Sequence, residues 1–159
     1  SNERINLHET VVEAIRLVRL SRSGRAVECL STCPPELELQ GDRQRFLQLF
    51  INLLTNACDA SRPGEKVEVF ATRDDDRIHI EVRDRGEGIP KDLRNRVFEP
   101  FFTTKRPGEG TGLGLPMVYK IIDDYGGSIE LDSESGAGTR VIVRLPSPAL
   151  SVQTQSMVS

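Results

Sequence analysis

Several features that would assign this 159-residue sequence to a special class of protein are missing. No apolar run approaches the roughly 20 residues of a membrane-spanning helix, and no signal peptide opens the sequence. Three cysteines are too few and too irregularly spaced for a disulfide framework. The net charge of −3 gives no general attraction for nucleic acid. We therefore expect a cytoplasmic protein that binds no nucleic acid, with a membrane segment left open only for a longer parent protein.

The cysteines also lack the partners of a zinc site. Cys29 and Cys33 have no companion pair of His or Cys residues in the sequence. We interpret both residues, together with Cys58, as reduced thiols, which are typical of cytoplasmic proteins.

Length and composition indicate one globular domain. The sequence is 37% hydrophobic and 28% charged, as in ordinary globular proteins, and its length fits a single domain. We expect this domain to cover residues 1–146. The segment 147–159 is rich in Ser, Gln and Pro and is expected to be a disordered tail.

Periodicity predicts an α+β domain. Apolar residues at helical spacing predict helices over residues 7–20, 43–61 and 113–125, and Pro90 predicts the start of a further short helix. Strand patterns cover residues 26–30, 67–72, 78–83, 128–133 and 139–145. The last four should form two hairpins, so we expect a two-layer domain in which a mixed sheet carries about three helices on one face.

The helix predicted over residues 43–61 carries a polar stripe. Gln48, Asn52, Asn56 and Asp59 are spaced by four, four and three residues, which places them along one side of an otherwise apolar helix. The stripe suits the solvent-facing side of a half-buried helix. It also suits a magnesium site, because amide oxygens are hard ligands and Mg²⁺ binds with retained waters and substrate phosphates.

Two glycine-containing segments carry further candidate sites. Asp84, Gly86 and Gly88 follow the strand predicted over residues 78–83, so the carboxylate can accept a hydrogen bond from an exocyclic amine while the glycines let the backbone pass close to a flat ring. An ordinary turn with a capping aspartate has the same pattern.

The second segment, residues 110–115, opens the helix predicted over residues 113–125. Free N–H groups at a helix start, reached through glycines, bind anions. Gly110, Gly112 and Gly114 alternate with Thr111 and Leu113, but no Gly-Lys-Ser/Thr of a Walker A motif and no Rossmann fingerprint is present. We therefore expect a phosphate loop of another type.

Four segments in fixed order resemble a known set of motifs: residues 52–57, 84–90, 98–105 and 110–115. They are similar to the N, G1, F and G2 boxes of the catalytic, ATP-binding domain of sensor histidine kinases, with the F box in its nitrogen-regulation-like form. The resemblance implies the Bergerat ATP-binding fold and Mg-ATP as ligand. It also implies phosphoryl transfer to a histidine on a separate dimerisation domain.

The resemblance also implies individual roles. Asn56 would bind Mg²⁺, with Asn52 supporting the phosphates one turn earlier and Asp59 facing the ribose and phosphates. Asp84 would accept the adenine amine, with Thr139 reaching the same base, and Lys105 would screen the terminal phosphates. The remaining nucleotide contacts would be Ala60, Gly86, Gly88, Ile89, Phe102, Thr103, Thr104, Gly110, Thr111, Gly112, Leu113, Gly114 and Leu115. Phe102 suits a core anchor equally well.

The phosphate-accepting half of a kinase is missing. His8 is followed by Glu9, but Val12 and Glu13 stand where the family's acceptor box has Asn/Thr and Pro. We interpret His8 as a surface residue and His79 as an outward-facing residue of a strand. The domain should therefore be a piece of a longer sensor protein, monomeric by itself, with the dimerisation domain and a response regulator as partners.

Two alternatives remain. One is a stand-alone ATPase or serine kinase of the same superfamily. Relatives of that kind that hydrolyse ATP carry a glutamate at position 52, and Asn52 cannot act as a general base. The other is a module that binds nucleotide for regulation without catalysis.

Overall fold

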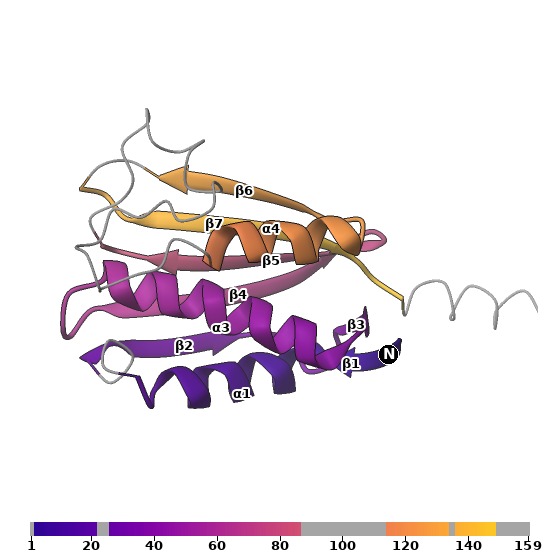
Figure 1. Cartoon of the computed structure of the whole chain (residues 1–159), viewed down its shortest axis with the longest axis horizontal. Coiled ribbons are helices and arrows are strands. Elements are labelled where there is room, and N and C mark those ends of the chain that lie inside the picture. Colours follow the sequence, from indigo (N-terminus) through magenta and orange to yellow (C-terminus); the bar gives the residue numbers. More distant parts are fainter. Residues whose placement is uncertain (1, 22–25, 87–113, 134–135, 149–159) are drawn as a thin grey trace, which may run out of the picture.

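The computed structural model describes residues 2–21, 26–86, 114–133 and 136–148. A five-stranded sheet forms one layer and helices form the other (Figure 1). This arrangement confirms the α+β class and the two-layer architecture expected from the sequence.

Three helices cover one face of the large sheet in the described part of the chain (Figure 1). They are α1 (Leu7–Val18), α3 (Arg43–Ala60) and α4 (Gly114–Asp124). The Asn6 side chain caps α1 by accepting a 2.9 Å hydrogen bond from the N–H of Glu9, and Asp42 caps α3 through the N–H of Gln44 at 2.9 Å. These caps satisfy N–H groups that have no partner within the helix. None of the helices within the described ranges has both the length and the apolarity that crossing a membrane requires.

The large sheet is mixed. Its order is β2-β4-β5-β7-β6, where β2 is Glu28–Thr32, β4 is Lys66–Asp74, β5 is Arg77–Asp84, β7 is Thr139–Pro146 and β6 is Ser128–Ser133. β2 runs parallel to β4, and all other neighbours are antiparallel. A second, two-stranded antiparallel sheet joins β1 (Glu3–Asn6) to β3 (Glu38–Gly41).

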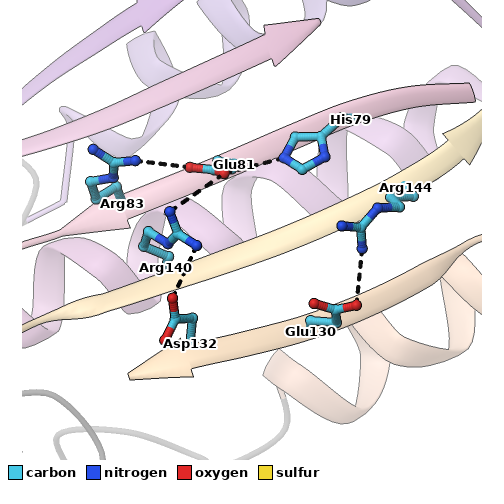
Figure 2. A network of polar contacts seen from close by, with 7 residues as sticks. All are labelled: His79, Glu81, Arg83, Glu130, Asp132, Arg140 and Arg144. Carbon is cyan, nitrogen blue, oxygen red and sulfur yellow. Dashed lines mark hydrogen bonds and ion pairs between the residues drawn. The ribbon is translucent and has the colours of Figure 1, made fainter. Parts of the chain in front are cut away.

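Residues alternate between the two faces of the sheet, as the period of a strand requires. Along β5, Ile78, Ile80 and Val82 are buried against the helices. The opposite face is polar, and Figure 2 shows that it carries cross-strand ion pairs. Their members are His79, Glu81, Arg83, Glu130, Asp132, Arg140 and Arg144. In the described part of the chain, the main hydrophobic core therefore lies between the sheet and the helices.

The structure confirms the three main helices and both hairpins predicted from the sequence. The strand expected at residues 26–30 lies two positions later, at Glu28–Thr32. β1 and β3 were not predicted, and Gly41, which stands just before the helix predicted over residues 43–61, is the last residue of β3. These two strands pair only with each other over four residues each, which is too short for a clear alternating pattern.

The described chain continues past the expected domain end at residue 146. Ser147 is buried, and its N–H donates a 2.8 Å hydrogen bond to the carbonyl of Asp76. Residues 149–159 of the expected tail lie outside the described residues. The same holds for the short helix expected to start at Pro90 and for residues 110–113 of the expected phosphate loop.

Candidate functional site

The polar stripe expected on α3 is present and connects this helix to α4. Gln48 donates a 3.1 Å hydrogen bond from Nε2 to Oδ1 of Asn52. Asn52 in turn donates from Nδ2 to Sδ of Met117 at 3.2 Å. Gln48 is exposed, whereas Asn52, Asn56 and Asp59 are half-buried. The stripe therefore runs from solvent into a partly enclosed region beside the first turn of α4.

Asp84 is the last residue of β5 and is 6% exposed. The N–H of Gly86 donates a 2.9 Å hydrogen bond to its Oδ1, and the backbone N–H of Thr139 donates a second one. Burial raises the pKa of Asp84, because it disfavours the charged form, and the two backbone donors act in the opposite direction. The result is a buried carboxylate whose two backbone donors fix its orientation.

Glycine is required twice around Asp84 because the backbone passes very close to its neighbours. A Cβ atom on Gly86 would lie 1.9 Å from the carbonyl oxygen of Ala60, the last residue of α3. A Cβ on Gly138, which has a positive φ of 85°, would lie 2.4 Å from the carbonyl oxygen of Asp84. These contacts hold the turn after Asp84 against α3 on one side and against the start of β7 on the other.

Thr139 pairs with Asp84 across β5 and β7 and is 8% exposed. Its Oγ1 lies 2.8 Å from Oγ of Ser133, the last residue of β6. Ser133 also donates to the carbonyl of Gly138 at 3.0 Å. Ser133 was not predicted from the sequence. The only available signal was the predicted hairpin, which brings the end of one strand opposite the start of the next.

Gly114 is the first residue of α4, and Leu115 packs half-buried against the core. The remaining predicted contacts lie outside the described residues: Gly88, Ile89, Phe102, Thr103, Thr104, Lys105, Gly110, Thr111, Gly112 and Leu113. The described members of the site are thus Asn52, Asn56, Asp59, Ala60, Asp84, Gly86, Gly114, Leu115 and Thr139.

These described members gather at one end of the molecule. β5 and β6 end there, β7 and α4 begin there, and α3 has its C-terminal half there, on the left of Figure 1. The contacts of Gly86 with Ala60 and of Asn52 with Met117 tie these elements together. Helix starts carry partial positive charge, so this end combines a buried carboxylate, an amide row and an anion-favouring helix terminus.

The oxygen atoms of this site can bind a magnesium ion only together with the oxygen atoms of a bound ligand. Asn56 offers one hard amide oxygen, and Mg²⁺ is commonly bound by few protein oxygens together with waters and phosphates. Within the described ranges, no three His, Cys, Asp or Glu side chains are placed to hold a metal together. A magnesium site here therefore requires phosphate oxygens to complete it.

The cysteines and histidines are not among the described members of the site. All three cysteines are free and buried, and Sγ of Cys29 lies 3.6 Å from Sγ of Cys58. His79 lies on the polar face of the sheet, where Nε2 is 3.2 Å from Oε1 of Glu81 (Figure 2), as expected. His8 is half-buried on α1.

Several known proteins are similar to this chain. Residues 41–149 match the family described as "Histidine kinase-, DNA gyrase B-, and HSP90-like ATPase". The chain is 41% identical to sporulation kinase A of Bacillus subtilis over 108 residues, which cover 68% of this chain and 18% of that protein. It is 37% identical to the sensory histidine kinase/phosphatase NtrB of Azospirillum brasilense over 146 residues, which cover 82% of this chain and 36% of that protein.

A solved structure has the same fold. The mycobacterial sensor histidine kinase MprB superposes with a TM-score of 0.82 at 30% identity, over 92% of this chain and 98% of that chain. By contrast, the chain spans well under half the length of sporulation kinase A and of NtrB.

Proposed function

This chain belongs to the family of histidine kinase-, DNA gyrase B- and HSP90-like ATPases, and we propose that it holds Mg-ATP for phosphoryl transfer within a longer sensor histidine kinase. Sporulation kinase A and NtrB both extend well beyond the region that this chain matches. The activity of the whole protein is therefore inferred from the chemistry of this site.

The observation that carries the proposal is the buried carboxylate of Asp84. A buried carboxylate with two backbone donors has lone pairs left for a ligand donor. The exocyclic amine of adenine supplies such a donor. Because Gly86 holds the turn tightly, the Asp84 carboxylate has a fixed position against which the base can bind. Thr139, paired with Asp84, contributes a hydroxyl at the same edge.

The phosphates lie toward α3 and the start of α4 in this proposal. Asn56 supplies an oxygen to Mg²⁺, Asn52 supports the phosphates, and Asp59 faces the ribose. The magnesium ion, when bound, neutralises charge on the phosphates. The N–H groups opening α4 and the Lys105 ammonium supply further positive charge.

Catalysis is then a matter of position and electrostatics. In the amide row of α3, Asn52 and Asn56 are neutral and neither acts as a general base for water. The chain therefore favours transfer to a protein nucleophile over hydrolysis, with a histidine of a separate dimerisation domain as the acceptor. A response regulator receives the phosphoryl group afterwards, and the domain by itself is a monomer in the cytoplasm.

The test is a calorimetric titration of the chain with ADP, with and without Mg²⁺. We expect saturable binding that tightens with magnesium. Asn56→Ala should remove the magnesium effect, whereas Gln48→Ala, at the exposed end of the same stripe, should preserve it. If a folded sample binds no ADP in either condition, the proposed function is wrong. If Asn56→Ala keeps the magnesium effect, the metal assignment alone is wrong.

A further inference from the structure

The inner face of the sheet ends in a buried polar row. Asp84 pairs with Thr139 on β7, and Thr139 pairs with Ser133 on β6. All three side chains are buried, with exposed fractions of 6%, 8% and 2%. The neighbouring inward-facing positions of β5 are apolar. Burying polar groups costs free energy unless they are hydrogen-bonded, so the hydrogen bonds of this row decide what it presents to a ligand.

The direction of the hydrogen bonds in the row follows from the number of protons. The carbonyl of Gly138 can only accept, so Ser133 uses its single hydroxyl proton in the 3.0 Å bond to that carbonyl. The 2.8 Å contact between Ser133 and Thr139 must then use the proton of Thr139. As a result, the Thr139 hydroxyl has no proton left for a ligand and offers only lone pairs.

We propose that Ser133 is a positioning residue for base selection, because it takes the hydroxyl proton of Thr139 and so makes Thr139 a hydrogen-bond acceptor toward the base. This inference rests on the proposed nucleotide site. Asp84 is also an acceptor when ionised. The row therefore presents acceptors from two adjacent strands to any base that lies against it.

A row of acceptors distinguishes two classes of purine. A 6-aminopurine such as adenine presents N–H donors at position 6, whereas a 6-oxopurine such as guanine presents an acceptor oxygen there. Two facing acceptors bind the first and repel the second. Without Ser133, the Thr139 hydroxyl can rotate and donate to the oxygen of a 6-oxopurine. Loss of the Ser133 hydroxyl should therefore reduce selectivity more than it reduces nucleotide binding in general.

The experiment compares ADP and GDP by calorimetric titration of the whole chain in the presence of Mg²⁺. The variants are Ser133→Ala, Ser133→Thr, Thr139→Val and the double variant. We expect Ser133→Ala to lower the ratio of ADP affinity to GDP affinity by about fivefold, the size of one neutral hydrogen bond. Ser133→Thr keeps a hydroxyl and should restore the ratio. In the Thr139→Val background, Ser133→Ala should change the ratio no further.

Circular dichroism on heating checks that each variant is folded. If Ser133→Ala does not fold, Ser133→Cys carries the same test, because a thiol keeps the volume and is a weak hydrogen-bonding group. An unchanged ratio in a folded Ser133→Ala or Ser133→Cys variant, with the unmodified chain binding ADP, overturns the role of Ser133 alone. Equal loss in Ser133→Ala and Ser133→Thr also overturns it. No nucleotide binding by the unmodified chain overturns the proposed function and this inference together.

Discussion

The backbone at Gly86 lies so close to α3 that a Cβ atom there would be 1.9 Å from the carbonyl oxygen of Ala60. The φ angle of Gly86 is not positive, so glycine is needed here for space rather than for backbone conformation. This contact fixes the distance between the turn after Asp84 and the helix that carries Asn56.

Gly86→Ala should therefore weaken ADP binding. The added methyl group forces the turn away from α3, and overpacking of this kind costs about 1–3 kcal/mol. A loss of that size in binding free energy is roughly 5- to 150-fold in affinity. Calorimetric titration measures the effect. Gly64→Ala is the control, because Gly64 has a positive φ of 88° but nothing within 4 Å of its Cβ position. The control should lose some stability and keep its ADP affinity; equal affinity losses in both variants would refute the steric explanation.

Binding of ADP should depend on the ionisation of Asp84. Burial raises the pKa of this carboxyl above its ordinary value, and the proposed contact needs the charged form. Affinity should therefore fall as the pH drops toward this raised pKa, starting above the range near pH 3.9 in which an exposed aspartate titrates. Titrations with ADP at several pH values between about 8 and about 5 measure this dependence.

Asp84→Asn serves as the reference for that experiment. An amide cannot ionise, so the variant should bind ADP roughly tenfold or more weakly and retain only the pH dependence of the nucleotide itself. A wild-type profile that parallels that of Asp84→Asn would exclude titration of Asp84 as the cause.

The raised pKa also has a consequence for folding: this carboxyl stabilises the folded state less as the pH rises through the shifted range.

Tyr125 should contribute to stability without affecting the nucleotide site. Its hydroxyl accepts a 2.9 Å hydrogen bond from the N–H of Asp42, and its ring stacks on Phe46 with centroids 4.7 Å apart. Tyr125→Phe keeps the stacking and leaves the N–H without this acceptor, so the free energy of unfolding should fall by about 1 kcal/mol. Urea unfolding measures the loss. Phe46 lies near the start of α3, away from Asn56, and Tyr125 follows the end of α4, away from Gly114. A change in ADP affinity would therefore count against this separation.

Glu81 should stabilise the folded state at neutral pH and lose this effect in acid. Burial opposes its charged form, but hydrogen bonds from His79 and Arg83 and the charge of Arg140 outweigh burial and lower the pKa of Glu81 (Figure 2). A lowered pKa means that the stabilisation is fully present above the unfolded value of about 4.3 and disappears as the pH falls through the folded value.

Chemical unfolding at several acidic pH values tests this. Glu81→Gln should show a smaller loss of stability over the acid range than the unmodified chain. The matched control is Glu130→Gln, because Glu130 pairs only with Arg144 among the residues drawn in Figure 2 and its side chain is 61% exposed. We expect the control to keep the wild-type acid slope. A Glu81→Gln slope equal to that of wild type would contradict the assignment.

Much of the fold followed from local patterns. The helices were predictable because their apolar residues recur at helical spacing and clear caps such as Asp42 mark their starts. The β4–β5 hairpin was predictable because alternation is regular and three consecutive aspartates occupy the last position of β4 and the turn after it. β1 pairs with β3 through residues such as Ile5 and Leu39, which are distant in sequence. No local sequence pattern predicts such a pairing.

The site was predictable in its motifs but not in its supporting contacts. Asp84 and Asn56 belong to motifs with fixed spacing. Ser133 has no motif, because its role depends on the register that places it opposite Thr139. The closeness of Gly86 to Ala60 likewise depends on how a turn packs against a helix end, and sequence spacing alone does not encode that distance.

The contacts of α3 with both Gly86 and α4 have a consequence for how changes in this helix reach the site. Gly86 rests on Ala60, and α4 is joined to the same helix through Asn52 and Met117. A substitution that shifts α3 therefore displaces the turn after Asp84 and the start of α4 together. The helix thus acts as a common support, and a change in its packing alters both sides of the site at once.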